Sequence, residues 1–546
     1  AFIIITLAFA AGIPKVEIRT IFKDLLPTDD PFVQVYLDHQ NFGNPLMMSI
    51  MIKRKNGDIY TPETLQKVWQ MTRDVDLTPA VDHDAVISIS TEKLRYAEAT
   101  PDGVDLRALM DDKAPSTAEE VADFRRRVAM SPNARTFYVS PDETATLITV
   151  GFHHNIDYGV AFDYVNGLVE KARDADHDVY LAGQPVLTGW VYKLQKQTYS
   201  IFGVTCGALI IALVLYMRNV AGVVTPIVCA AVAAIWGFGF FGWLERPVEP
   251  LLMIVPLLLV ARSFSHCVQY TERYYEVLMH LKDRRKAAEV TMAIMMAPSV
   301  LGIMTDVFGI IFIAVAPILT MVNHAIFCGA WALWIIPTGV FLISILLSYL
   351  PAPKNLENIV GGEEKESGIH LLEEKALAGI ARITTGKAAV VTGIPTVVLG
   401  VLSIYVNSLI KIGNPVEGSG LLWHDSEFNT AVRAINAHFP GMNTLEIVFE
   451  SKLEGNERRA AWTPEYVRVA QTIQSIMEAD PVMPPRATLS FADYMSEVYR
   501  LFSGGNPKWQ ILDPTDQAVS TAGLGVKSLL CRGLGSFLTM AGRDSG

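Results

Sequence analysis

The stretch from residue 249 to residue 271 reads EPLLMIVPLLLVARSFSHCVQYT. Its length and apolar composition fit the ~20 residues with which a helix crosses a lipid bilayer. Arg262 lies near the middle, where a charged side chain costs about 2.5–3.5 kcal/mol to insert. Ser265, His266 and Gln269 follow Arg262 at helical spacing, so we expect all four side chains on one helix face. The stretch predicts a membrane span with polar groups at mid-depth.

Further apolar runs of spanning length lie along the chain, at about 198–217, 222–243, 294–316, 321–349 and 388–410. A shorter run, Ala1 to Ile13, opens the chain. We interpret it as the outer half of a first spanning helix, with a signal-peptide remnant as the alternative. Together the runs predict about seven spans in a polytopic α-helical membrane protein.

The composition excludes several classes of function. The chain has 546 residues, of which 51% are hydrophobic and 18% charged, and its mean hydropathy is +0.29. The net charge of −11 argues against a nucleic acid partner, because a polyanion needs a basic surface. Cysteines are scattered without ligand spacing, so we expect neither disulfides nor a metal site. No nucleophile motif or phosphate loop is present. We therefore expect no enzyme and no bound cofactor.

Residues 14–195 differ from the spans and have the character of a water-soluble α+β domain. Leu46–Ile52 and Ala145–Val150 alternate in the manner of strands. Thr61-Pro62-Glu63 predicts the start of a helix, with Thr as N-cap and Pro in the first turn. Residues 157–174 predict a second helix. The expected organisation is 1–13 (end of helix 1), 14–195 (first outer domain), 196–350 (helices 2–6), 351–387 (loop), 388–410 (helix 7) and 411–546 (second outer domain, truncated).

Basic residues indicate how the spans are oriented. Arg273, Lys282 and Arg284–Lys286 lie between the fourth and fifth spans, and further Lys and Arg residues lie within 351–387. Because Lys and Arg gather on the cytoplasmic side, both connections are expected there and both large domains on the opposite, periplasmic side. Residues 274–292 are basic and amphipathic, which predicts a helix along the cytoplasmic membrane surface, with a plain linking helix as the alternative.

The region after the seventh span repeats the region after the first. Leu25-Leu26-Pro27 parallels Leu421-Leu422-Trp423, Phe42-Gly43 parallels Phe439-Pro440-Gly441, and Thr61-Pro62-Glu63 parallels Thr463-Pro464-Glu465. The matches keep their order, and each group follows a spanning helix. Duplication explains them better than chance, and parallel repeats are a known transporter architecture. We interpret the chain as a first repeat with the start of a second.

The fifth span carries Thr305 and Asp306 near its middle. Opposite charges at matching depths on neighbouring spans predict a pair between Arg262 and Asp306. His266, one turn from Arg262, belongs to the residue type that changes charge near neutral pH. A proton relay is the functional interpretation, and a static link between helices is the structural one. His324, near the outer end of the sixth span, is expected at the membrane interface. The candidate site consists of Arg262, Ser265, His266, Gln269, Thr305 and Asp306.

The layout of one span, an outer domain, six spans and a second outer domain resembles the resistance-nodulation-division (RND) superfamily. It is most similar to the MMPL-type exporters, with kinship to Patched-like and sterol-sensing proteins. Leu25-Leu26-Pro27 and the ending Glu272-Arg273-Tyr274-Tyr275-Glu276 of the fourth span carry the local likeness. The family's acidic positions in that span fall on Ser265 and His266 here, so the resemblance leaves the acidic role to Asp306.

The resemblance implies a transporter in the bacterial inner membrane, driven by the proton-motive force. Its expected cargo is a hydrophobic, lipid-like molecule. Membrane lipids, a homo-oligomer and a periplasmic partner are the further partners that it implies. The alternative on the same scaffold is a lipid- or sterol-sensing protein, or an accessory of protein export, that transports nothing.

Overall fold

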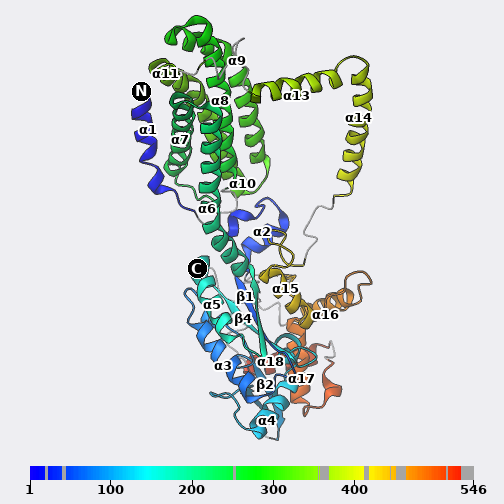
Figure 1. Ribbon diagram of the computed structural model, residues 1–546. Helices are drawn as coiled ribbons and strands as arrows, with labels where there is room; N and C mark the ends of the chain where they lie inside the picture. The colour runs from blue at the N-terminus through cyan, green and yellow to red at the C-terminus, as the bar shows by residue number, and fades with distance from the viewer. Residues whose placement is uncertain are drawn as a thin grey trace, which may run out of the picture. The chain divides into compact units, whose positions relative to one another are not determined.

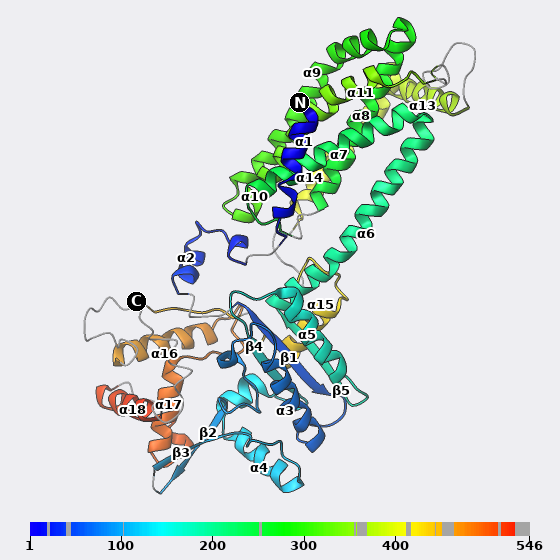
Figure 2. The same ribbon diagram turned by 90° about the vertical axis from the view of Figure 1, so that its left-hand side faces the viewer.

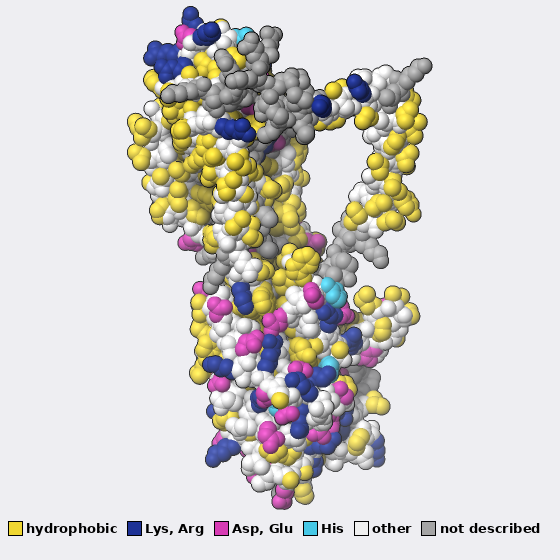
Figure 3. Space-filling model, viewed as in Figure 1, with side chains coloured by type: hydrophobic (Ala, Val, Ile, Leu, Met, Phe, Trp, Pro, Cys, Tyr) yellow, Lys and Arg dark blue, Asp and Glu magenta, His cyan; other side chains and the backbone are white. Residues whose placement is uncertain are grey.

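A computed structural model shows how these segments fold. It describes residues 1–18, 22–39, 45–101, 103–249, 254–353, 356, 368–410, 417–442, 444–449, 463–511 and 515–529. The chain divides into two compact units. The helical unit comprises residues 1–34 and 193–413, and the sheet unit comprises 35–192 and 414–546. Figure 3 shows hydrophobic side chains over the helical unit and charges of both signs over the sheet unit.

The helical unit holds the apolar runs, and the unit boundaries fall inside α2 and α6. Helices α7, α8 and α10 contact one another, α9 packs against α8, α10 and α11, and α10, η7 and α11 form one continuous span (Figure 1). The elements are α1 (Phe2–Ala10), η1 (Ile13–Lys15), η2 (Phe22–Leu25), α2 (Pro31–Asp38), α6 (Gln184–Met217), α7 (Val220–Trp243), α8 (Ile254–Leu281), α9 (Arg284–Ile311), η6 (Phe312–Val315), α10 (Leu319–Ile336), η7 (Pro337–Leu342), α11 (Ile343–Tyr349), α13 (Gly368–Thr384) and α14 (Gly386–Ser408).

In the described part of the chain, five helical segments are long and apolar enough to cross a membrane. They are Gln184–Met217, Val220–Trp243, Arg284–Val315, Leu319–Tyr349 and Ala389–Ser408. These segments coincide with the expected second, third, fifth, sixth and seventh spans. Helix α8, the expected fourth span, is not among them; residues 250–253, which open its apolar run, lie outside the described residues. It nevertheless packs between α7, α9 and α10.

The single surface helix expected over residues 274–292 is wrong. Residues 274–281 are the last turns of α8, and residues 284–292 are the first turns of α9. Lys282 adopts the left-handed conformation (φ 53°) that ends a helix. Asp283 then caps α9 by accepting hydrogen bonds from the backbone N–H groups of Arg285 and Lys286. The basic, amphipathic pattern of residues 274–292 therefore belongs to a hairpin of two helices.

Helix α1 docks on α7 through three glycines. A Cβ atom on Gly239 would lie 2.0 Å from the carbonyl oxygen of Phe9, and one on Gly242 would lie 1.9 Å from that of Gly12. Trp236 Nε1 donates to Thr6 Oγ1 at 3.0 Å across the same contact. Small residues allow two membrane helices to approach this closely, so the short α1 is held by backbone contact.

The sheet unit contains a three-stranded antiparallel sheet in the order β4-β1-β5. Figure 2 shows α3 and α5 along it, and β2 and β3 form a separate hairpin. Apolar runs produce β1 and β4, which are buried on both faces and pair through Ile50 and Ile148. The elements are β1 (Met47–Arg54), α3 (Pro62–Asp76), η3 (His83–Ala85), β2 (Arg95–Thr100), β3 (Gly103–Ala108), α4 (Ala118–Ala129), η4 (Ala134–Tyr138), β4 (Ala145–Gly151), α5 (Tyr158–Ala172), β5 (His177–Gly183), α15 (Glu427–His438), α16 (Pro464–Glu478), α17 (Phe491–Phe502), η10 (Pro507–Trp509) and α18 (Asp516–Leu529).

Two helices of the sheet unit occupy matching places in the proposed repeat. Thr61 caps α3 and Thr463 caps α16, each with Pro in the first turn, and both helices span 15 residues. The N-cap predicted at Thr61 is therefore present. The two segments that the predicted repeat relates belong to one unit, in which α15 packs on β5 and buries Phe428 and Ile435 in the core of the sheet. Phe42–Gly43 lies outside the described residues.

Candidate functional site

Arg262 of α8 and Asp306 of α9 form an ion pair. Arg262 Nε donates to Asp306 Oδ2 at 2.8 Å. Helices α8 and α9 are antiparallel neighbours joined by a tight turn, so two positions far apart in sequence meet at one level. The pairing predicted from the sequence is therefore present. Its part in proton transfer stays a prediction.

The ion pair belongs to an open polar face of the helical unit. The side chains of Arg262 and Asp306 are 41% and 38% exposed. Ser265 and Gln269 of α8 and Thr305 of α9 are exposed beside them. Thr305 Oγ1 donates to the carbonyl of its own helix at Leu301. We call Arg262, Ser265, Gln269, Thr305 and Asp306 the polar seam.

His266 lies at the buried edge of this face. It is only 5% exposed and packs against the sixth span. A Cβ atom on Gly339 would lie 2.9 Å from His266 Cδ2, so glycine makes room for the ring. Four residues turn an α-helix by ~400°, which rotates His266 ~40° past Arg262 and toward α10 and η7. The glycine lies too far along the chain for helical periodicity to reveal this.

The sixth span is distorted opposite His266. Its segment η7 is a π-helix that begins at Pro337, where the missing N–H interrupts the α-helical hydrogen bonds. Single π-turns inside α-helices are frequent at functional sites. His266 Nε2 and Ser263 Oγ are buried and have no hydrogen-bond partner among the described residues. Native proteins leave few such groups unpaired, so this position calls for a functional explanation.

Tyr270 and Tyr274 continue the inward face of α8 below His266, at steps of four residues. The Tyr270 hydroxyl hydrogen-bonds with Ser344 Oγ, which itself donates to the carbonyl of Val340 at 2.6 Å. Tyr274 donates to the carbonyl of Leu347 at 3.0 Å. These polar groups line the contact between α8 and α11. Sequence reasoning missed the tyrosines, although the i, i+4, i+8 spacing from His266 could have identified them.

His324, for which a position at the membrane interface stays a prediction, is buried inside the helical unit at 8% exposure. Its ring lies 3.5 Å from Cys328 Sγ, one turn further along α10. The preceding Asn323 accepts a hydrogen bond from Arg246 at 2.8 Å. Neither residue belongs to the polar seam.

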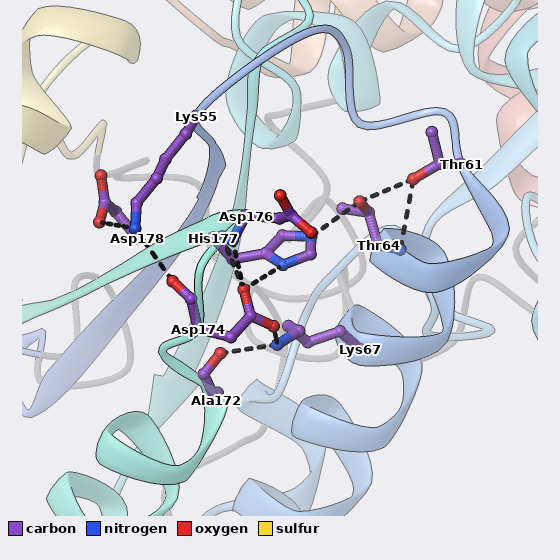
Figure 4. Close-up of polar contacts among 9 residues, drawn as sticks. All are labelled: Lys55, Thr61, Thr64, Lys67, Ala172, Asp174, Asp176, His177 and Asp178. Carbon is purple, nitrogen blue, oxygen red and sulfur yellow. Dashed lines mark hydrogen bonds and ion pairs between the residues drawn. The ribbon is translucent and has the colours of Figure 1, made fainter.

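A second polar cluster lies in the sheet unit, between α3 and β5 (Figure 4). His177 is buried, with Nδ1 2.9 Å from Asp174 Oδ1 and Nε2 2.9 Å from Thr64 Oγ1. Lys67 Nζ donates to Asp174 Oδ2 at 2.6 Å. Lys67 holds the pKa of Asp174 well below its usual value, with help from the hydrogen bonds of His177 and the backbone.

A Thr–His–Asp triad can activate the threonine hydroxyl as a nucleophile. Thr64 is fully buried, however, and its hydroxyl also hydrogen-bonds with Thr61 Oγ1 at 2.8 Å. A substrate could not reach it without unfolding the start of α3. The cluster instead ties α3 to the edge strand β5 and to the turn that precedes it, so we assign it a structural role.

Comparison with known proteins agrees with the fold. The model of the MMPL family matches residues 61–334, which is about half of the chain. A relative from Methanocaldococcus jannaschii, named as a membrane protein, is 22% identical over 372 residues. Those residues cover 64% of this chain and 87% of the relative. With its several membrane-spanning helices, the chain is a multi-pass membrane protein, as the resemblance to RND-type exporters predicted, and it belongs to the MMPL family.

Proposed function

We propose that the protein is a transporter driven by the proton-motive force, which exports hydrophobic or amphiphilic, lipid-like molecules. One observation carries the proposal: an Arg–Asp pair lies one helical turn along α8 from a buried histidine whose Nε2 has no hydrogen-bond partner among the described residues. Intramembrane ionisable groups are expensive to insert and mark ion or substrate pathways by default. A static link between helices would need Arg262 and Asp306 but not His266.

The three groups can act as a proton switch. Arg262 is a permanent positive charge that compensates the carboxylate of Asp306. Addition of a proton to Asp306 removes that attraction and frees α8 to move relative to α9. His266 faces the π-helix, the part of the sixth span that can change its hydrogen bonding most readily. Protonation would therefore bias two packings of the same helices, as coupled transport requires.

The same proposal covers the cargo, the orientation in the membrane and the partners. Family membership supports a transporter-like role. The basic residues at the α8–α9 turn support a cytoplasmic position for that end, with the sheet unit in the periplasm of a bacterial inner membrane. The sheet unit would then receive a lipid-like cargo from the membrane. A periplasmic partner would meet the protein on this side.

The test is transport by the purified protein in proteoliposomes. A fluorescent phospholipid analogue serves as cargo, and an acid-outside pH gradient drives transport. We expect Asp306→Asn and His266→Gln to abolish gradient-driven transport. Glu245→Gln, which alters an exposed Lys15–Glu245 pair, serves as the matched control and keeps it. Undiminished transport by correctly folded Asp306→Asn, judged by its elution as a single species in detergent, would refute the proton switch.

The direct 2.8 Å contact between Arg262 and Asp306 supports a second candidate, a non-transporting sensor of lipids or sterols, or an accessory of protein export. In that case the pair is a structural link. Asp306→Asn would then lower stability, and no gradient-driven flux would exist in the unmodified protein either. Binding of a lipid, compared with binding of an unfolded polypeptide, separates the two versions of this candidate.

A further inference from the structure

Three hydroxyl groups and one imidazole nitrogen inside the helical unit have no hydrogen-bond partner among the described residues. They belong to Ser263 and His266 of α8 and to Thr291 and Ser299 of α9, and all four side chains are buried. Leaving a buried polar group unpaired costs its full desolvation energy. The packing of the unit itself encloses these atoms, so an element on its outer surface does not reach them. The smallest partner that satisfies such groups is a water molecule.

His266, Ser299 and Thr291 lie at successive levels between the middle of their helices and the α8–α9 turn. The ion pair of Arg262 with Asp306 sets a common level on the two antiparallel helices. At 1.5 Å per residue, His266 lies about 6 Å from this level toward the turn, Ser299 about 11 Å and Thr291 about 22 Å. The three groups therefore form a descending series along the helix axes.

Buried tyrosines of α8 fill the intervals of this series, at about 12 and 18 Å from the same level. The Tyr270 hydroxyl hydrogen-bonds with Ser344 Oγ, and Tyr274 donates to the carbonyl of Leu347 at 3.0 Å. The charge of Arg284, which is exposed at the α8–α9 turn, acts on Tyr274. Polar groups thus recur about once per helical turn from the buried histidine toward the exposed turn.

The unpaired hydroxyls of α9, rather than the tyrosines, can complete a path along this series. Tyr274 donates to a backbone carbonyl, and Ser344, the partner of the other tyrosine, donates to the carbonyl of Val340 at 2.6 Å. A carbonyl accepts a hydrogen bond but has no hydrogen to pass on. In the described part of the chain, the hydroxyls of Ser299 and Thr291 remain free to donate at these levels.

We propose that a row of water molecules lies beside Ser299 and Thr291, between α8, α9 and the sixth span, and carries protons between His266 and the α8–α9 turn. Water and hydroxyl groups each donate and accept hydrogen bonds. A proton that leaves His266 Nε2 binds to the oxygen of the nearest water, which releases another of its hydrogens to the next oxygen. After the last transfer the proton is in the solvent at the turn, and every water and hydroxyl of the row is neutral again.

The water path rests on the proposed proton-driven transport and gives its two ionisable sites separate connections. His266 exchanges protons with the solvent at the α8–α9 turn, whereas Asp306 lies on the open face of the two helices. The charges of Arg262 and Asp306 act on His266, so the protonation state of one site affects the other.

Exchange of the imidazole Cε1 hydrogen for deuterium tests whether water reaches His266. The full chain is incubated in heavy water in lipid nanodiscs, and its histidine-containing peptides are analysed by mass spectrometry. Rates are compared on the plateaus of their pH profiles, which removes differences in protonation. His177 is the matched reference, because it is similarly buried but has both ring nitrogens bonded to protein. We expect His266 to exchange at least about tenfold faster than His177. Equally slow exchange of the two rings would overturn the proposal.

Two substitutions on α9 test the route. Thr291→Val keeps the shape of its side chain, and Ser299→Ala removes only a hydroxyl. We expect the double variant to slow the exchange of His266 at least about fivefold, because apolar walls do not hold water. Thr271→Val is the matched control on α8: its buried hydroxyl already donates to the carbonyl of Cys267 at 2.8 Å, so the exchange of His266 stays unchanged. Undiminished exchange in the double variant would show that water reaches the ring by another route and would refute the path.

The exchange requires no transport, so the water path and the proposed function can fail separately. Slow exchange of His266, together with gradient-driven transport that Asp306→Asn abolishes, would refute the path alone. Rapid exchange that the α9 double variant slows, in a protein that moves no lipid under a pH gradient, would refute the transporter and leave the path in place.

Discussion

The contact between α1 and α7 yields a prediction that can be worked out from distances. In Gly239→Ala, the new Cβ would lie 2.0 Å from the carbonyl oxygen of Phe9 and 2.5 Å from the carbonyl carbon. A carbon and an oxygen approach to about 3.3 Å at closest. Since the neighbouring atoms are backbone, no side chain can turn away, and α1 must retreat by about 1 Å.

The loss of stability follows from the contacts that the movement of α1 disrupts. Overpacking of a close contact costs about 1–3 kcal/mol. The same movement stretches two hydrogen bonds of 3.0 Å, from Trp236 Nε1 to Thr6 Oγ1 and from Trp243 Nε1 to the carbonyl of Ala8. Each such bond in a membrane protein contributes about 0.6 kcal/mol. We therefore expect Gly239→Ala to lower the free energy of unfolding by about 2–4 kcal/mol.

The measurement is unfolding by SDS in mixed micelles, followed by far-ultraviolet circular dichroism. Gly309→Ala is the matched control, because it also lies within a spanning helix and its Cβ would meet no atom within 4 Å. Both substitutions gain the same helix propensity. The difference between their free energies of unfolding therefore isolates the cost of the clash. If Gly239→Ala unfolds within about 0.5 kcal/mol of Gly309→Ala, the close approach of α1 to α7 is wrong.

Three further predictions concern single interactions. Thr61→Ala and Thr463→Ala should each destabilise their helix by about 1 kcal/mol, which hydrogen exchange in the first turns of α3 and α16 detects. The pKa of Asp174 is lower in the folded state, so its ionised carboxylate stabilises the sheet unit. This contribution is complete above pH ~4 and is lost as the pH falls further. Urea unfolding of Asp174→Asn should lack that acid-dependent loss. Tyr270→Phe removes the hydrogen bond to Ser344 and should cost about 1 kcal/mol in SDS unfolding; an unchanged midpoint would contradict the pairing.

Local rules were sufficient for several elements. Strands β1 and β4 and the Thr61 cap of α3 depend on neighbouring residues, and the structure contains all three. Both strands are buried on both faces, however, and do not alternate as expected. Five apolar runs coincide with spanning helices for the same reason. The helix expected over 274–292 failed because amphipathic character was considered without the stop at Lys282 and the cap at Asp283.

The sequence by itself determined that Arg262 and Asp306 are partners, because a buried charge in a membrane needs an opposite charge at its own depth. Only the tertiary structure decided which way each polar residue of α8 faces. His266 turns inward because Gly339, far along the chain, leaves space for its ring, while Ser265 and Gln269 remain outside. A helix's periodicity specifies the angles between its side chains, but the neighbouring helices choose which of those angles is buried.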